Sequence, residues 1–169
     1  MALWRDGGFA DDQWTTLDDS AAIPDRGAIV VSFARWQADK TTLETRADPV
    51  GVAIAADKDA VERLAEAARR PLVALKFDKF ADGRAFSYAE LLRERHGFKG
   101  ELRATGDVLL DEIALMRRCG FTAFEVTDAN TLRALKEGRL PKSALFYQPA
   151  LGPREAPVGT RPWLRRATS

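Results

Sequence analysis

The feature of this sequence that most constrains its fold is a regular alternation of short apolar runs with amphipathic segments. Residues 28–33, 50–55 and 72–77 are continuous runs of apolar and β-branched residues, which are typical of strands covered on both faces. Residues 57–70 carry an apolar stripe at helical spacing. Strands that alternate with helices form βαβ units, and their right-handed crossovers make the strands parallel. We therefore expect an α/β fold with a mainly parallel sheet of repeated βα units, either open or curved into a partial barrel.

The second half of the chain repeats this rhythm, with turn and cap signals between the segments. The remaining predicted elements are, in order, a helix that begins with a capping box of Ser87 and Glu90, a strand at 101–104, a helix from about 108 to Gly120, a strand at 121–126, a helix near 130–137 and a strand at 144–147. These elements bring the number of predicted inner strands to six.

The two ends of the chain depart from this pattern. Trp4 and Trp14 flank an Asp-Gly-Gly turn at residues 6–8, which predicts an N-terminal hairpin or an apolar arm on the domain. The stretch 151–169 is rich in proline and arginine, which predicts an extended basic tail. A chain of 169 residues with 46% hydrophobic content can bury one full core. We therefore expect a single α/β domain at 1–150, followed by the tail.

The charge balance excludes recruitment of a partner by a global electric field. The chain has 26 Lys and Arg against 25 Asp and Glu, which gives a formal net charge of +1. Such a balance argues against nucleic-acid binding and against an anionic membrane surface. No apolar run approaches the roughly 20 residues that span a bilayer, and the N-terminus lacks the basic and apolar regions of a secretory signal. We expect a cytoplasmic protein without a membrane or nucleic-acid partner.

Cysteine and histidine are too scarce for the common metal and redox sites. Cys119 and His96 are the single members of their residue types, which rules out an intrachain disulfide and predicts no metal or iron–sulfur centre. Cys119 lies near a predicted helix C-terminus, where the dipole disfavours a thiolate, so we expect a buried, inert thiol. The sequence has no glycine-rich phosphate-binding motif. We predict no cofactor.

Polar residues follow several of the predicted strands. In parallel α/β sheets, ligands bind beyond the carboxyl ends of the strands, where helix N-termini converge. The sequence therefore predicts a polar rim at this edge, made of Lys76, Asp78, Lys79, Asp82, Arg84, Arg103, Thr105, Gly106, Asp107, Glu125, Thr127, Asp128 and Gln148.

Within this rim, two arginines could bind an anionic ligand. Arg84 and Arg103 could together hold a carboxylate, sulfate or phosphate, because guanidinium groups match these anions in a bidentate manner. The structural alternative is that each arginine pairs with a nearby carboxylate, such as Asp82, Asp107 or Glu125. Asp82 is also explained as part of an Asp-Gly turn, and Asp107 as a helix N-cap.

Ordered blocks in the middle of the chain resemble a known family. The longest block is residues 77–87, FDKFADGRAFS, and it is followed by matching blocks at 91–93, 97–104, 106–109 and 118–121. This stretch is similar to the signature of a bacterial family catalogued as domain of unknown function 934. The polar motif residues that match are Asp82, Arg84, Ser87, Arg103, Asp107 and Arg118.

The resemblance implies a genomic context rather than a chemistry. Members of this family typically occur beside genes for assimilatory sulfite reductase and for the reductase of activated sulfate. We therefore expect an accessory protein of sulfite reduction in cysteine biosynthesis, which binds a sulfite reductase component or assists electron delivery to it. Some members are labelled oxidoreductases on that context, and whether this chain is an enzyme stays open.

An alternative function uses the polar rim directly, as a small-anion-binding enzyme or sensor. A purely structural subunit is a third reading. We assign no catalytic residue. The candidate ligand-binding residues are Asp82, Arg84, Ser87, Arg103, Asp107 and Glu125.

Overall fold

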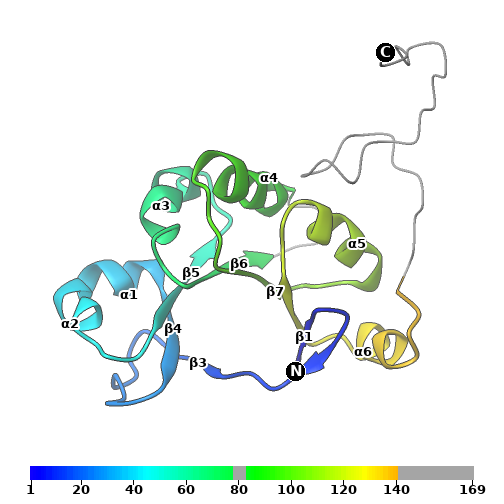
Figure 1. Ribbon diagram of the computed structural model, residues 1–169, viewed down its shortest axis with the longest axis horizontal. Coiled ribbons are helices and arrows are strands. Elements are labelled where there is room, and N and C mark those ends of the chain that lie inside the picture. Colours follow the sequence, from blue (N-terminus) through cyan, green and yellow to red (C-terminus); the bar gives the residue numbers. More distant parts are fainter. Residues whose placement is uncertain (78–82, 141–169) are drawn as a thin grey trace, which may run out of the picture.

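The fold is built on a single curled sheet. A computed structural model of the chain describes residues 1–77 and 83–140. The eight strands run in the spatial order β2-β1-β8-β7-β6-β5-β4-β3, and Figure 1 shows them as an open half-barrel. Their bounds are β1 (Ala2–Arg5), β2 (Gly8–Ala10), β3 (Trp14–Thr16), β4 (Ala28–Ser32), β5 (Val50–Ala55), β6 (Leu72–Phe77), β7 (Glu101–Gly106) and β8 (Ala123–Val126).

The predicted α/β class and mainly parallel sheet are confirmed, although the sheet is mixed. Strands β3 to β8 pair in parallel, each with the next along the chain. Strand β1 pairs antiparallel with both β8 and β2. A hairpin turn explains the pairing of β1 with β2. Asp6 and Gly7 have φ of 52° and 87°, as a tight turn between antiparallel strands requires. Of the two N-terminal alternatives, the hairpin is the one that forms.

The helices cover the convex face of the sheet (Figure 1). Among the described residues, none of them is long and apolar enough to cross a membrane. Their bounds are α1 (Phe33–Ala38), α2 (Lys40–Glu44), α3 (Ala60–Ala67), α4 (Arg84–Glu90), a π-helical turn η1 (Leu91–Arg95), α5 (Leu110–Arg118) and α6 (Ala129–Lys136).

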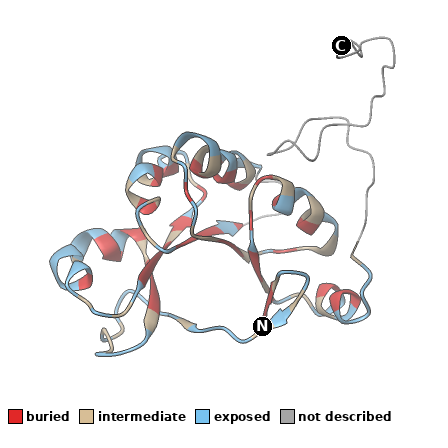
Figure 2. Ribbon diagram, viewed as in Figure 1, coloured by how far each residue is buried: buried red, intermediate tan, exposed pale blue. Residues whose placement is uncertain are grey.

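The two faces of the sheet carry different side chains. On β6, Val73, Leu75 and Phe77 belong to the main core, which they share with the buried faces of the helices. Leu72 and Ala74 belong instead to a small separate cluster on the other face. Because successive strand residues point to opposite faces, the bulky side chains lie under the helices. Figure 2 shows this burial along the strands and on the inner sides of the helices.

The predicted start of the helix at Ser87 differs from the structure. The capping box at Ser87 is wrong, because α4 begins at Arg84 with Gly83 as its N-cap. Ser87 therefore lies inside the helix, and its carbonyl accepts a hydrogen bond from the N–H of Leu91. The predicted strand at 144–147 and the tail lie outside the described residues.

Arg93 joins two loop segments at the amino ends of the strands. Its Nε donates to the carbonyl of Gly120 at 2.9 Å. Its Nη1 donates to the carbonyls of Phe98 at 2.8 Å and Gly100 at 3.0 Å. The guanidinium also lies 5.0 Å from the centre of the Phe98 ring. One half-buried cation thus fixes both the entry to β7 and the end of α5.

We expect Arg93→Met to lower the free energy of unfolding by about 3 kcal/mol, because hydrogen bonds from a charged donor are lost and three part-buried carbonyls need new partners. Arg95→Met is the matched control, since Arg95 lies in the same turn and is exposed. Urea denaturation of both variants measures the effect. Equal stabilities for the two variants would show that the Arg93 contacts contribute nothing.

Candidate functional site

Side chains fill the concave face of the sheet unevenly between the amino ends and the carboxyl ends of the strands. Near the amino ends of the strands, Val30 and Leu72 are buried and pack against Trp14. These bulky side chains close the lower end of the half-barrel, as layers of branched side chains do in closed α/β barrels. The interior above them is therefore the region where a ligand could enter.

The next row of side chains toward the carboxyl ends of the strands is mostly alanine. The register places Ala53 beside Ala74, Ala74 beside Arg103 and Arg103 beside Ala123. A methyl group on each of these neighbours leaves most of the interior unfilled, whereas branched side chains would pack it solid. The cavity thus follows from small residues on one face of the adjacent strands β5 and β6.

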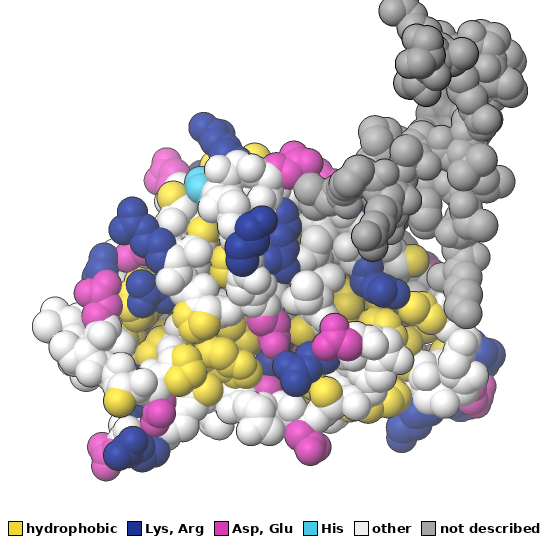
Figure 3. Space-filling view, viewed as in Figure 1, with side chains coloured by type: hydrophobic (Ala, Val, Ile, Leu, Met, Phe, Trp, Pro, Cys, Tyr) yellow, Lys and Arg dark blue, Asp and Glu magenta, His cyan; other side chains and the backbone are white. Residues whose placement is uncertain are grey.

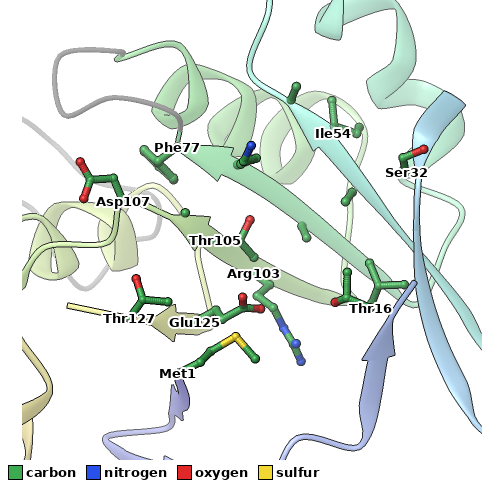
Figure 4. Close-up of a pocket in the computed structure, with 16 residues that line it drawn as sticks. Met1, Thr16, Ser32, Ile54, Phe77, Arg103, Thr105, Asp107, Glu125 and Thr127 are labelled. Atoms are coloured by element: carbon green, nitrogen blue, oxygen red, sulfur yellow. The ribbon is translucent and has the colours of Figure 1, made fainter. Parts of the chain in front are cut away.

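This cavity opens at the carboxyl ends of the strands and has a volume of about 800 Å³, which suits a small organic ligand. On the face of the molecule shown in Figure 3, hydrophobic side chains gather near the middle, with acidic and basic side chains beside them. Figure 4 shows the lining residues converging from several strands. The polar side chains that line it are Thr16, Ser32, Lys76, Arg103, Thr105, Asp107, Glu125 and Thr127.

Arg103 lies at the base of the cavity and is held by two carboxylates. Its Nη1 and Nη2 donate to Asp12 at 2.7 and 2.9 Å, in a bidentate arrangement. Its Nε donates to Glu101 at 2.9 Å. Arg103 is 2% exposed, and a buried guanidinium needs such partners to offset its desolvation. The structural alternative for Arg103 is therefore realised, but with partners other than the expected carboxylates.

The Asp12–Arg103 pair changes the proton affinity of both groups. Burial favours the neutral form of Asp12, but the hydrogen bonds from Arg103 and Trp14 and the charges of Arg103 and Arg5 outweigh it, so the pKa of Asp12 lies below its usual value. Burial likewise opposes the charge of Arg103, while Asp12 and Glu101 raise its pKa above the ordinary value. Both groups therefore stay charged over the physiological range.

Glu125 is the half-buried carboxyl of the cavity wall. Burial raises its pKa above the usual value; Arg103 opposes the rise, Asp12 adds to it, and the amino group of Met1 opposes it. Among the described side chains, none donates a hydrogen bond to this carboxylate. Glu125 therefore presents acceptor oxygens to the cavity.

The structure brings together three of the six candidate residues. Arg103, Asp107 and Glu125 all line the cavity. Arg84 and Ser87 are exposed on helix α4 and are not among its lining residues. The expected fork of Arg84 and Arg103 is therefore not formed in this cavity, and Asp82 lies outside the described residues.

Asp107 is held at the cavity mouth by the backbone rather than by a helix cap. The N-cap of α5 is Leu109, so the N-cap interpretation of Asp107 is wrong. Its N–H donates to the carbonyl of Phe77 at 2.9 Å. The preceding Gly106 has φ of 85°, and a Cβ there would lie 2.3 Å from the same carbonyl oxygen. Only glycine permits this close turn between β7 and β6.

Asp12 is the site residue that sequence reasoning missed. It lies between the edge strands β2 and β3, 91 positions from Arg103. A buried arginine in the middle of a strand was the available signal, because such a charge demands a carboxylate partner. The sequence did not indicate which carboxylate would reach it.

The fold and this cavity define an α/β half-barrel protein with an open ligand-sized pocket at the carboxyl ends of its strands. The chain belongs to the family described as bacterial protein of unknown function (DUF934), whose model matches residues 51–158. That range includes strands β5 to β8 and therefore most of the cavity wall. No curated protein and no solved structure matches the chain.

We expect Asp12→Asn to lower the free energy of unfolding at pH 7 by about 1–2 kcal/mol, because Arg103 loses a charged partner. Since the folded pKa of Asp12 is lowered, its contribution is present above the unfolded pKa and is lost as the pH falls through the folded value. The difference from wild type should therefore shrink at pH 3 and below. Asp11→Asn is the control, and urea denaturation at both pH values is the measurement; a difference that persists at low pH would contradict the ion-pair explanation.

Proposed function

We propose that this protein is an accessory protein of assimilatory sulfite reduction that works by binding a small molecule in the half-barrel cavity. The observation that carries the binding function is the cavity itself. It combines a volume of about 800 Å³ with an alanine floor and convergent polar groups from strands that are distant in sequence. Apolar pockets with a few placed polar groups are the usual form of a small-molecule site.

The position of the cavity supports the same function. It lies at the carboxyl ends of parallel strands, where α/β folds place their ligands. The lower end is closed by Leu72 and Val30, so a ligand would enter from the mouth beside Asp107 and Thr127. This geometry suits a molecule that is held and released, whether for sensing or for chemistry.

The place in sulfite reduction rests on the resemblance, which associates the family with sulfite reductase genes. We propose that the ligand-bound or free protein contacts a sulfite reductase component and assists electron delivery to it. The hairpin supplies a docking element in this proposal, because Phe9 on β2 is 41% exposed. An exposed aromatic residue is a common anchor in protein interfaces.

The charges around the cavity make the anion-binding alternative less favourable. Arg103 is already engaged by Asp12 and Glu101, and Lys76 is the other cationic side chain among the described residues that line the cavity. The carboxylates of Asp107 and Glu125 would repel a second negative charge nearby. A small anion such as sulfite therefore fits this cavity less well than an organic molecule with mixed polarity.

Filling the cavity should abolish binding. The measurement is thermal unfolding of the protein in the presence of small polar metabolites, including cysteine and sulfite. A ligand at a hundred times its Kd should stabilise the wild type by about 2.7 kcal/mol. Ala74→Leu on the floor and Ala55→Leu on the rim should remove this stabilisation. Ala38→Leu, at an exposed position on α1, should retain it. Stabilisation that persists in both cavity variants would place the ligand elsewhere.

The accessory role predicts a direct contact with sulfite reductase. Purified protein should retain the reductase haemoprotein at micromolar concentration, and Phe9→Asp should weaken the retention about tenfold by removing an apolar anchor. Leu115→Asp is the matched control, because Leu115 on α5 is 45% exposed, against 41% for Phe9. Absence of retention by the wild type would reject the role, and equal loss in both variants would reject the hairpin as the docking element.

A further inference from the structure

We propose that the cavity selects a zwitterionic ligand, with a protonated amine on Glu125 and a carboxylate or similar anion toward Lys76. This inference rests on the proposed ligand-binding function and specifies the ligand's chemical class. It follows from how three polar side chains are arranged across neighbouring strands.

The three side chains form one row across the cavity wall. Lys76 on β6 is in register with Thr105 on β7. The β7–β8 register pairs Arg103 with Ala123 and Ala104 with Phe124, and its continuation places Glu125 beside Thr105. All three line the cavity, and Figure 4 shows Thr105 and Glu125 on adjacent strands. Two strand spacings separate the outer pair, so their backbones lie about 10 Å apart.

This row has opposite charges at its two ends and a hydroxyl between them. A lysine ammonium and a glutamate carboxylate at opposite ends of the row create a field directed along it. A dipolar molecule lying over Thr105 would be aligned by that field, whereas a simple anion or cation would be attracted at one end and repelled at the other. The row therefore discriminates between charge patterns rather than net charge.

Glu125 is suited to accept from a charged donor. The other carboxylates at the base, Asp12 and Glu101, already accept hydrogen bonds from Arg103. Glu125 accepts none from a described side chain, although it is half-buried and faces the cavity. An ammonium group on the ligand would supply the charged hydrogen bond that this half-buried carboxylate does not receive from the described side chains.

The floor of the cavity determines which chemical group would fit between the two charged ends of the ligand. Ala53 and Ala74 present methyl groups beneath the row, and they favour an aliphatic segment between the two charged ends. The ligand is therefore of the amino-acid class, with a short apolar body. The mouth beside Asp107 and Thr127 leaves room for a further polar substituent.

The test uses four probes that share a six-carbon body: ε-aminocaproate, caproate, hexylamine and hexanol. Titration of the full-length protein, followed by backbone amide chemical shifts, gives a Kd for each. We expect ε-aminocaproate to bind about tenfold more tightly than each of the other three. The shifted amides should be those of β6, β7 and β8.

Two variants test which side chain contacts each end of the ligand. Glu125→Gln should weaken ε-aminocaproate and hexylamine about tenfold and change caproate little, because a charged hydrogen bond is replaced by a neutral one. Lys76→Met should weaken the binding of ε-aminocaproate and caproate and should not weaken that of hexylamine. Asp107→Asn replaces the second acidic residue of the cavity wall and tests whether that carboxylate holds the amine instead. Glu94→Gln, at an exposed position on η1 outside the cavity lining, is the control that should leave the order of the probes unchanged.

The failure of this inference is distinguishable from the failure of the proposed function. If hexanol binds as tightly as ε-aminocaproate and Ala74→Leu abolishes both, the cavity is a ligand site but the zwitterion inference is wrong. If Asp107→Asn rather than Glu125→Gln removes the preference for the amine, Glu125 is not the amine site and the inference is also wrong. If none of the four probes shifts the amides of β6 to β8, the inference falls together with its premise of a binding cavity.

Discussion

The structure depends on one constraint, which is the short link between its two edge strands. Strands β2 and β3 lie at opposite edges of an eight-stranded sheet, yet only residues 11–13 connect them. A flat sheet of this size would separate its edges by about 34 Å, whereas such a link reaches about 14 Å at most. The sheet must therefore curl, and its curvature creates a concave interior. The Asp12–Arg103 pair then fixes the link over that interior.

Much of the fold could be predicted because its signals are local. Apolar runs such as 50–55 and 72–77 and the Asp-Gly turn at residues 6–7 indicate strands and a hairpin without tertiary information, and these elements are present. The helix at Ser87 shows the limit of such signals. A Ser-x-x-Glu pattern marks a helix start only where the chain before it is not helical, and α4 had already begun at Arg84.

The site could be predicted only in part, because its assembly depends on contacts between distant segments. The rule that ligands meet at the carboxyl ends of strands led to Arg103, Asp107 and Glu125, which line the cavity together. The same rule included Arg84, which lies on α4 away from the lining residues. The partner of Arg103 was also beyond sequence analysis, because Asp12 reaches it through a link whose path depends on the curled sheet.

The residues that carry the family resemblance perform two separable tasks. Arg93 and the glycines at 100 and 120 form a contact network at the amino ends of the strands, far along β7 from the cavity mouth. Gly106 and Asp107, at the other end of β7, shape that mouth. A family signature of this kind therefore contains a structural part, which stabilises the half-barrel, and a part that shapes the cavity. Arg103 lies between them and pairs with Asp12 and Glu101, while the row above it, from Lys76 to Glu125, contributes further polar side chains to the cavity wall.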